Sequence, residues 1–219
     1  MKLGDVLQQV YEALESADLY YGHGTDNAWD EAVCLVLCAA NLPIDSGQEV
    51  LAMPLDQTAL TKIQEWTRRR IEERLPLPYL TGRAWFAGLE FNVVPGTLIP
   101  RSPIAELIEQ QFAPWCVQPP EHVLDLCTGG GCIAAAIAYH LPESQVDGVD
   151  LDPAAVELAR ENVRKLRLES RVNIYLGDLF SPVEGKQYDL IVSNPPYVDA
   201  QDMENLPEEY RHEPVHALA

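Results

Sequence analysis

Positively charged residues are scarce in this chain. Lys and Arg together number 15, against 34 Asp and Glu, which gives a formal net charge of -19 at pH 7. Such a charge repels a phosphate backbone, so we expect no tight direct binding to DNA or RNA. It favours a basic protein as the partner, although acidity that only aids solubility would give the same balance.

Long apolar runs and paired cysteines are also missing. No stretch approaches the roughly 18 apolar residues of a membrane span, and Lys2 and Asp5 interrupt the N-terminus at once. We therefore expect a cytoplasmic protein without membrane attachment. The five cysteines are odd in number and form no Cys-x-x-Cys pair, which disfavours a disulfide framework and a metal site.

The first part of the chain has the pattern of helices. Apolar residues recur at helix spacing over residues 3–14 and 32–40, and Asp56 is the expected N-cap of a third helix. These signals predict a small helical bundle over residues 1–80. The run Arg68-Arg69-Arg70 is more typical of a solvated helix face than of a partner contact.

The pattern changes twice after residue 80. Extended, partly aromatic residues surround Gly88 over residues 81–104, which predicts a β-hairpin linker. Over residues 105–219 strand and helix signals alternate, with strands expected at 122–126, 145–149, 172–176 and 189–192. This alternation predicts an α/β unit with parallel strands, whose ligand site lies at the carboxyl ends of the strands.

A glycine-rich turn follows the first of these strands. Its candidate cofactor-binding residues are Asp125, Thr128, Gly129, Gly130 and Gly131. Glycines there let the backbone approach a ligand closely, and Asp150, about 20 residues on, suits ribose hydroxyls. Asp178 and Leu179, after the third strand, are candidates for contacting adenine. Asp125 as a simple turn cap and Asp178 as an ordinary loop residue remain open alternatives.

The motif Asn194-Pro195-Pro196-Tyr197, after the fourth strand, indicates the chemistry. A planar amide or amine nitrogen is a poor nucleophile because its lone pair is delocalised. The Asn194 side-chain oxygen and the Pro195 carbonyl can hold its NH2 group and aim the lone pair at a methyl donor, while Tyr197 covers it. Two prolines that merely end a strand are the alternative.

The glycine turn alone does not identify the cofactor. Gly129, Gly131 and Ala134 also satisfy the G-x-G-x-x-A spacing of dinucleotide-binding proteins. The Asn-Pro-Pro-Tyr motif, however, has no role in hydride transfer. The combination therefore favours S-adenosyl-L-methionine over a nicotinamide cofactor.

Several segments together match one known family. They are Tyr79-Leu80-Thr81-Gly82, Phe86-x-Gly88-x-x-Phe91, Leu98-Ile99-Pro100-Arg101, the glycine turn, Asp150, Gly177-Asp178 and Ser193 to Tyr197. In these the chain resembles the HemK-like protein glutamine methyltransferases. The resemblance implies a Rossmann-like class I methyltransferase domain preceded by a helical substrate-recognition domain. It also implies that Asn194 to Tyr197 hold a glutamine amide and that Arg101 lies at the entrance of the cofactor pocket.

The branch of the family is indicated by two segments. Ser102-Pro103-Ile104-Ala105-Glu106 and Trp85 to Phe91 resemble the branch that methylates a glutamine of the third large-subunit ribosomal protein, uL3. A basic ribosomal protein is therefore the expected substrate. The alternatives are a release-factor glutamine methyltransferase, a nucleic-acid amino-methyltransferase and a non-catalytic module with this fold.

The chain departs from the family pattern in two ways. Cys127 stands where the family commonly has glycine, and only four strands are recognisable where relatives have seven. We therefore expect a C-terminally truncated fragment with little turnover. Its fourth strand is expected to present an unpaired edge.

Overall fold

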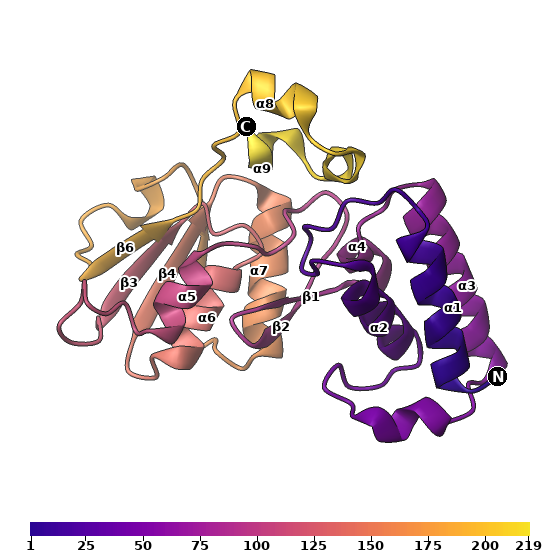
Figure 1. Cartoon of the computed structure of the whole chain (residues 1–219). Coiled ribbons are helices and arrows are strands. Elements are labelled where there is room, and N and C mark those ends of the chain that lie inside the picture. The colour runs from indigo at the N-terminus through magenta and orange to yellow at the C-terminus, as the bar shows by residue number, and fades with distance from the viewer. The chain divides into compact units, whose positions relative to one another are not determined.

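The computed structural model describes residues 1–219, which form two compact units (Figure 1). The helical unit comprises Met1–Gly82 together with Leu206–His212. The second unit, which we call the α/β unit, comprises Arg83–Asn205 together with Glu213–Ala219. None of the helices combines the length and apolar character that crossing a bilayer requires.

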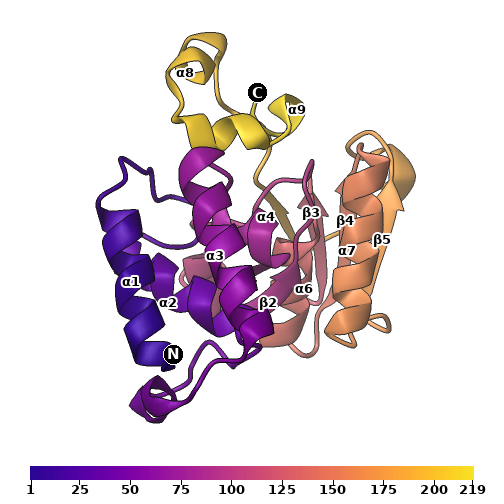
Figure 2. The same ribbon diagram turned by 90° about the vertical axis from the view of Figure 1, so that its right-hand side faces the viewer.

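The helical unit is a small bundle, as predicted, in which α1 and α3 lie side by side (Figure 2). Its elements are α1 (Leu3–Glu15), α2 (Ala28–Ala39), the 3₁₀ helix η1 (Gln48–Ala52), α3 (Gln57–Glu72), α4 (Leu77–Thr81) and the 3₁₀ helix η3 (Glu208–His212). The predicted apolar stripe of α1, from Leu3 to Leu14, is buried, and each such side chain contributes about 1.5–3 kcal/mol. Asp56 caps α3 by accepting a hydrogen bond from the N–H of Ala59 at 2.7 Å.

The three consecutive arginines of α3 do not share one environment. Arg68 and Arg69 lie on a solvated face and form ion pairs with nearby glutamates, as the sequence indicates. For Arg70 that prediction is wrong, because its side chain is only 1% exposed. Arg70 lies seven positions, about two turns, after the buried Ile63, so it points to the same side of the helix.

The α/β unit begins with the predicted hairpin. Strand β1 (Arg83–Phe86) pairs antiparallel with β2 (Leu89–Asn92) through a two-residue turn. Ala87 and Gly88, the two turn residues, have φ of 47° and 76°, the left-handed pair that suits the twist of a tight hairpin. The hairpin is held against α7 (Pro153–Lys165) because the Asn162 side chain bonds the backbone N–H and carbonyl of Asn92, at 2.7 and 3.2 Å.

The predicted parallel sheet of four strands is present. The strands are β3 (His122–Leu126), β4 (Gln145–Asp150), β5 (Val172–Leu176) and β6 (Leu190–Ser193), in the order β5-β4-β3-β6. The chain moves outward from β3 to β5 and then returns to place β6 on the other side of β3. Strand order therefore reverses between β3 and β6, where α/β proteins bind their ligands.

The two faces of this sheet are covered unequally. Helices α5 (Ile104–Glu109), α6 (Cys132–His140) and α7 pack over the larger apolar cluster on one face (Figure 1). A smaller cluster, which includes Leu124 and Val149, packs with Val183 of the 3₁₀ helix η2 (Ser181–Val183). Strand β6 pairs only with β3, so the expected unpaired edge is present. Beyond β6 the chain forms α8 (Ala200–Asn205) and, near its end, α9 (Val215–Leu218).

Candidate active site

A cavity of about 540 Å³ opens at the carboxyl ends of the four parallel strands. It is lined by Gly96, Thr97, Leu98, Cys127, Gly129, Val149, Asp150, Leu151, Asp152, Ala155, Gly177, Asp178, Leu179, Asn194, Pro196, Pro214, His216 and Ala217. All of these residues belong to the α/β unit. The cavity is thus at the position that strand order predicts, and its volume is typical of a site for a small molecule.

The glycine turn forms one wall of this cavity. Gly129 has φ of 55°, and a Cβ added to it would meet no atom within 4 Å. Its N–H donates to Asp150 Oδ2 at 2.7 Å, so the turn is bonded to the end of the second strand. The absent side chain therefore leaves space that a ligand can occupy beside the backbone.

The other two glycines of the turn serve its packing. A Cβ on Gly131, whose φ is 78°, would lie 2.9 Å from the Ala159 Cβ, so this glycine lets α6 and α7 approach closely. The carbonyl of Gly130 accepts a hydrogen bond from the buried Asn162 side chain at 2.9 Å. Neither glycine lines the cavity. Asn162, which also holds the hairpin, had no motif to mark it in the sequence.

Asp125 and Thr128 lie in the interior. Asp125 is fully buried, and its Oδ2 accepts hydrogen bonds from Thr128 Oγ1 at 2.6 Å and from the N–H of Ala134 at 3.0 Å. Burial raises the pKa of Asp125 to about 7, and Oδ1 has no partner. Neither residue lines the cavity, so their contacts hold the turn in shape from below the surface.

Cys127 lines the cavity in a conformation that explains the family's glycine. Its φ is 59°, a left-handed value that glycine adopts without strain. Burial and the neighbouring Asp150 raise the pKa of the Cys127 thiol above its ordinary value. The side chain is therefore a neutral thiol at physiological pH and not a nucleophilic thiolate.

The two predicted acidic positions lie in the cavity wall. Asp150 is fixed by two backbone groups, because its Oδ1 also accepts from the N–H of Asp152 at 3.0 Å. Asp178 and Leu179 follow β5 and line the cavity as well. A carboxylate has about four acceptor positions, so Asp150 keeps capacity for further donors such as hydroxyl groups.

The Asn-Pro-Pro-Tyr motif meets the same cavity. Asn194 and Pro196 line it, whereas Pro195 and Tyr197 do not, and Tyr197 is 79% exposed. The Asn194 Oδ1 accepts a hydrogen bond from Ser102 Oγ at 3.4 Å. A hydrogen bond also joins the strands that precede the motif and the glycine turn, because Ser193 Oγ donates to the carbonyl of Leu126 at 2.9 Å.

Arg101 lies outside the cavity lining and binds a carboxylate from the end of the chain. Its guanidinium nitrogens lie 2.8 and 2.9 Å from the two carboxylate oxygens of Glu213, whose side chain is fully buried. Glu213 Oε2 also accepts from the N–H of Ile99 at 3.0 Å. Arg101 thus fastens the chain just before Pro214, the first cavity-lining residue of that segment.

Comparison with known proteins identifies the family. The family model described as Methyltransferase small domain matches residues 108–213. The ribosomal protein uL3 glutamine methyltransferase of Bordetella pertussis is 44% identical over 219 residues, which are 99% of this chain and 74% of that protein. Its counterpart in Francisella tularensis is 41% identical over 216 residues, 98% of this chain and 69% of that protein. The chain belongs to the uL3 glutamine methyltransferase family.

Membership of this glutamine methyltransferase family confirms the resemblance seen in the motifs. Among solved structures, a SAM-dependent methyltransferase from Agrobacterium tumefaciens is similar with a TM-score of 0.42 and 22% identity. It covers 52% of this chain and 39% of that one.

The cavity fits S-adenosyl-L-methionine in three respects. Gly129 leaves room for a ligand beside the backbone, and Asp150 offers acceptors for ribose hydroxyls. Leu151, Ala155 and Leu179 add apolar surface on which a flat base can pack. Asn194 then lies in the wall of the same cavity, where an acceptor amide would meet a methyl donor.

Part of the wall could not be found from motifs. Pro214, His216 and Ala217 come from the end of the chain, and His216 Nε2 lies 3.3 Å from Asp152 Oδ2. In the sequence these residues follow a run of charged side chains that is typical of a solvated surface. No local spacing marks them as cavity residues.

Proposed function

We propose that this chain transfers a methyl group from S-adenosyl-L-methionine to the side-chain amide nitrogen of a glutamine in ribosomal protein uL3. The observation that carries the proposal is that Asn194 and Pro196 line the same cavity as Gly129 and Asp150. One cavity thus joins a motif suited to planar nitrogens with a turn suited to a nucleoside. Family membership supports the acceptor, because both relatives are uL3 glutamine methyltransferases.

The acceptor amide is held by Asn194 and Pro195. The Asn194 side-chain oxygen and the Pro195 carbonyl each accept one N–H of the glutamine NH2 group, which points the nitrogen lone pair into the cavity. Pro196 has no N–H that could compete for the Pro195 carbonyl. As the N–CH3 bond forms and the S–CH3 bond breaks, positive charge develops on the nitrogen and both acceptors bind it more strongly, which lowers the barrier. S-adenosylhomocysteine is the leaving group, and the nitrogen gives up one proton to solvent.

The methyl donor is held at the other end of the cavity. Bound S-adenosyl-L-methionine supplies a sulfonium methyl group that is ready for transfer. Asp150 would bind the ribose hydroxyls, Gly129 would let the backbone lie against the ligand, and Asp178 and Leu179 would contact the adenine. These groups would bind and orient the donor, and Asn194 and Pro195 would orient the acceptor. Tyr197, which is exposed, would cover the acceptor amide once it is bound.

The charge of the chain fits a basic protein acceptor. A net charge of -19 attracts a cationic ribosomal protein and speeds the encounter, while it disfavours naked RNA. Such an acceptor places the reaction in the cytoplasm, where ribosomal proteins are made.

The test is methyl transfer from radiolabelled S-adenosyl-L-methionine to three purified acceptors: unmethylated uL3, an unmethylated release factor and deproteinised ribosomal RNA. We expect label in uL3 alone, incorporated slowly. Label in the release factor would move the chain to the other glutamine-methylating branch, and label in RNA would overturn the substrate class. If no acceptor is labelled although calorimetry detects cofactor binding, the chain is a binding module and the proposal fails.

A further inference from the structure

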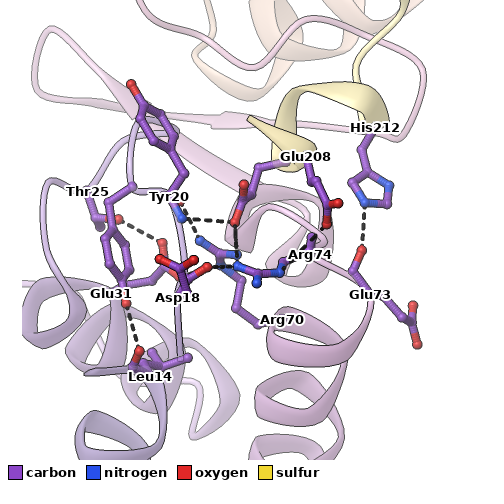
Figure 3. Close-up of polar contacts among 12 residues, drawn as sticks. Leu14, Asp18, Tyr20, Thr25, Glu31, Arg70, Glu73, Arg74, Glu208 and His212 are labelled. Carbon is purple, nitrogen blue, oxygen red and sulfur yellow. Dashed lines mark hydrogen bonds and ion pairs between the residues drawn. The ribbon is translucent and has the colours of Figure 1, made fainter. Parts of the chain in front are cut away.

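The buried Arg70 binds a carboxylate that comes from far along the chain. Its guanidinium donates to Glu31 Oε1 at 2.5 Å and to the carbonyl of Tyr20 at 2.8 Å (Figure 3). It also donates to Glu209 Oε1 at 3.2 Å. The Arg70 side chain is 1% exposed and both glutamate side chains are 3% exposed. Removing either carboxylate would leave part of a buried positive charge without its partner.

Glu209 is held by more than this one ion pair. Its Oε1 accepts from the N–H of Tyr20 at 3.0 Å and lies 3.6 Å from Arg74 Nη1. Burial acts to raise the pKa of Glu209, but the hydrogen bonds from Tyr20 and Arg70 outweigh it and leave the pKa below its ordinary value. Glu209 is therefore a charged anchor at physiological pH. Three residues later, His212 Nε2 lies 2.8 Å from the carbonyl of Glu73.

The part of the chain that contains Glu209 has few other fixed points. Between residues 200 and 218 the buried residues are Glu209, Glu213 and Leu218. Glu209 is bound within the helical unit, and Glu213, four positions on, is bound by Arg101 within the α/β unit. Two buried carboxylates, each paired with an arginine, thus hold this part of the chain.

The residues after these anchors form part of the active site. Pro214, His216 and Ala217 line the cavity. The carbonyl of Leu218 accepts hydrogen bonds from the N–H groups of Tyr197 and Val198, at 3.0 and 2.8 Å. The course of the chain after Glu209 therefore determines where these cavity-lining residues lie and whether Tyr197 keeps its hydrogen bond.

We propose that Arg70 is a positioning residue for methyl transfer, because its hold on Glu209 fixes the segment that supplies Pro214, His216 and Ala217 to the cavity wall and supports Tyr197. This inference rests on the proposed function for its effect on turnover. Arg70 touches neither substrate nor cofactor. It acts through the covalent chain that runs from Glu209 to Pro214.

Glu209→Gln and Glu31→Gln form a matched pair that separates positioning from stability. Both glutamates bind Arg70 and are equally buried, but only Glu209 belongs to the segment in question. We expect both variants to lower the melting temperature. Only Glu209→Gln should speed amide hydrogen exchange over residues 206–218 and weaken cofactor binding about three- to thirtyfold. The same variant should raise KM for uL3 more than it lowers kcat.

The proposal is overturned if residues 213–218 keep their protection in Glu209→Gln, or if Glu31→Gln changes exchange, cofactor affinity and KM equally. If Glu209→Gln does not fold, Arg70→Lys is the second variant. Lysine keeps the positive charge but lacks the planar guanidinium that donates to two carboxylates at once. We expect Arg70→Lys to change hydrogen exchange, cofactor affinity and KM in the same directions but by less. The absence of these changes also overturns the proposal. Exchange is measured without any acceptor, so failure of methyl transfer in the parent protein remains a separate result.

Discussion

The backbone N–H of Gly129 donates to the Oδ2 atom of Asp150 at 2.7 Å. This bond joins the glycine turn after β3 to the carboxylate at the end of β4, and both residues line the cavity. The turn and the carboxylate therefore have a fixed relationship before a ligand arrives. Such preorganisation lowers the free-energy cost of ordering the site when a ligand binds.

Asp150→Asn should weaken cofactor binding. Hydrogen bonds to a charged group contribute about 1.5–3 kcal/mol, so losing the charge should raise the Kd for S-adenosyl-L-methionine about ten- to hundredfold. Calorimetric titration measures this Kd. Glu157→Gln, an exposed position on α7 that lies outside the cavity, is the control and should leave the Kd as it is. An unchanged Kd in Asp150→Asn would remove Asp150 from the binding site.

Gly129→Ala should damage the site more than Gly130→Ala. Alanine at a φ of 55° costs about 1–2 kcal/mol of strain, and its methyl group would project into space that the ligand needs. At Gly130 an added Cβ would lie 3.2 Å from Leu158 Cδ2, the movable end of a side chain. Thermal unfolding and cofactor titration of both variants make the comparison. Equal cofactor affinities would show that the ligand does not lie against Gly129.

Local patterns predicted the elements that have a regular period or a cap. The stripe of α1, the cap Asp56 and the hairpin around Gly88 are encoded within a few residues each, and the structure has them. The alternation of strands and helices likewise predicted the parallel sheet, because only crossovers can join parallel strands.

Contacts between distant parts of the chain could not be predicted in this way. Arg70 and Glu209 are 139 positions apart, and each stands in a charged run that is typical of a solvated surface. Burial of both becomes favourable only when each supplies the other's hydrogen bonds, a condition that local periodicity does not record. The same holds for Arg101 and Glu213, and hence for the cavity wall that follows Glu213.

The buried carboxyl of Asp125 should make stability depend on pH. Its pKa is raised from 3.8 to about 7 in the folded protein, chiefly by burial. Between these values the folded state binds more protons than the unfolded state, so this group's contribution to stability falls as pH rises from about 4 to about 7 and levels off above that.

Asp125→Asn tests this pH dependence. Asparagine retains an acceptor for Thr128 and Ala134 but does not titrate. Urea unfolding at a series of pH values gives the free energy of unfolding for both proteins. The free energy of unfolding of the parent protein minus that of the variant should decline between about pH 4 and 7. A difference that is flat over this range, or that rises, would contradict the raised pKa.

Asn194, in the wall of the cofactor cavity, is proposed to hold the glutamine amide, and mass-spectrometric mapping of the methylated product tests this role. Unmethylated uL3 is incubated with S-adenosyl-L-methionine and either the parent chain or Asn194→Ala, with Asn205→Ala on α8 as the control. We predict one added methyl on the side-chain nitrogen of a single glutamine, formed about 10²–10³-fold more slowly by Asn194→Ala and at the parental rate by Asn205→Ala. A methyl group on any other atom, or an undiminished rate in Asn194→Ala, would contradict the claim.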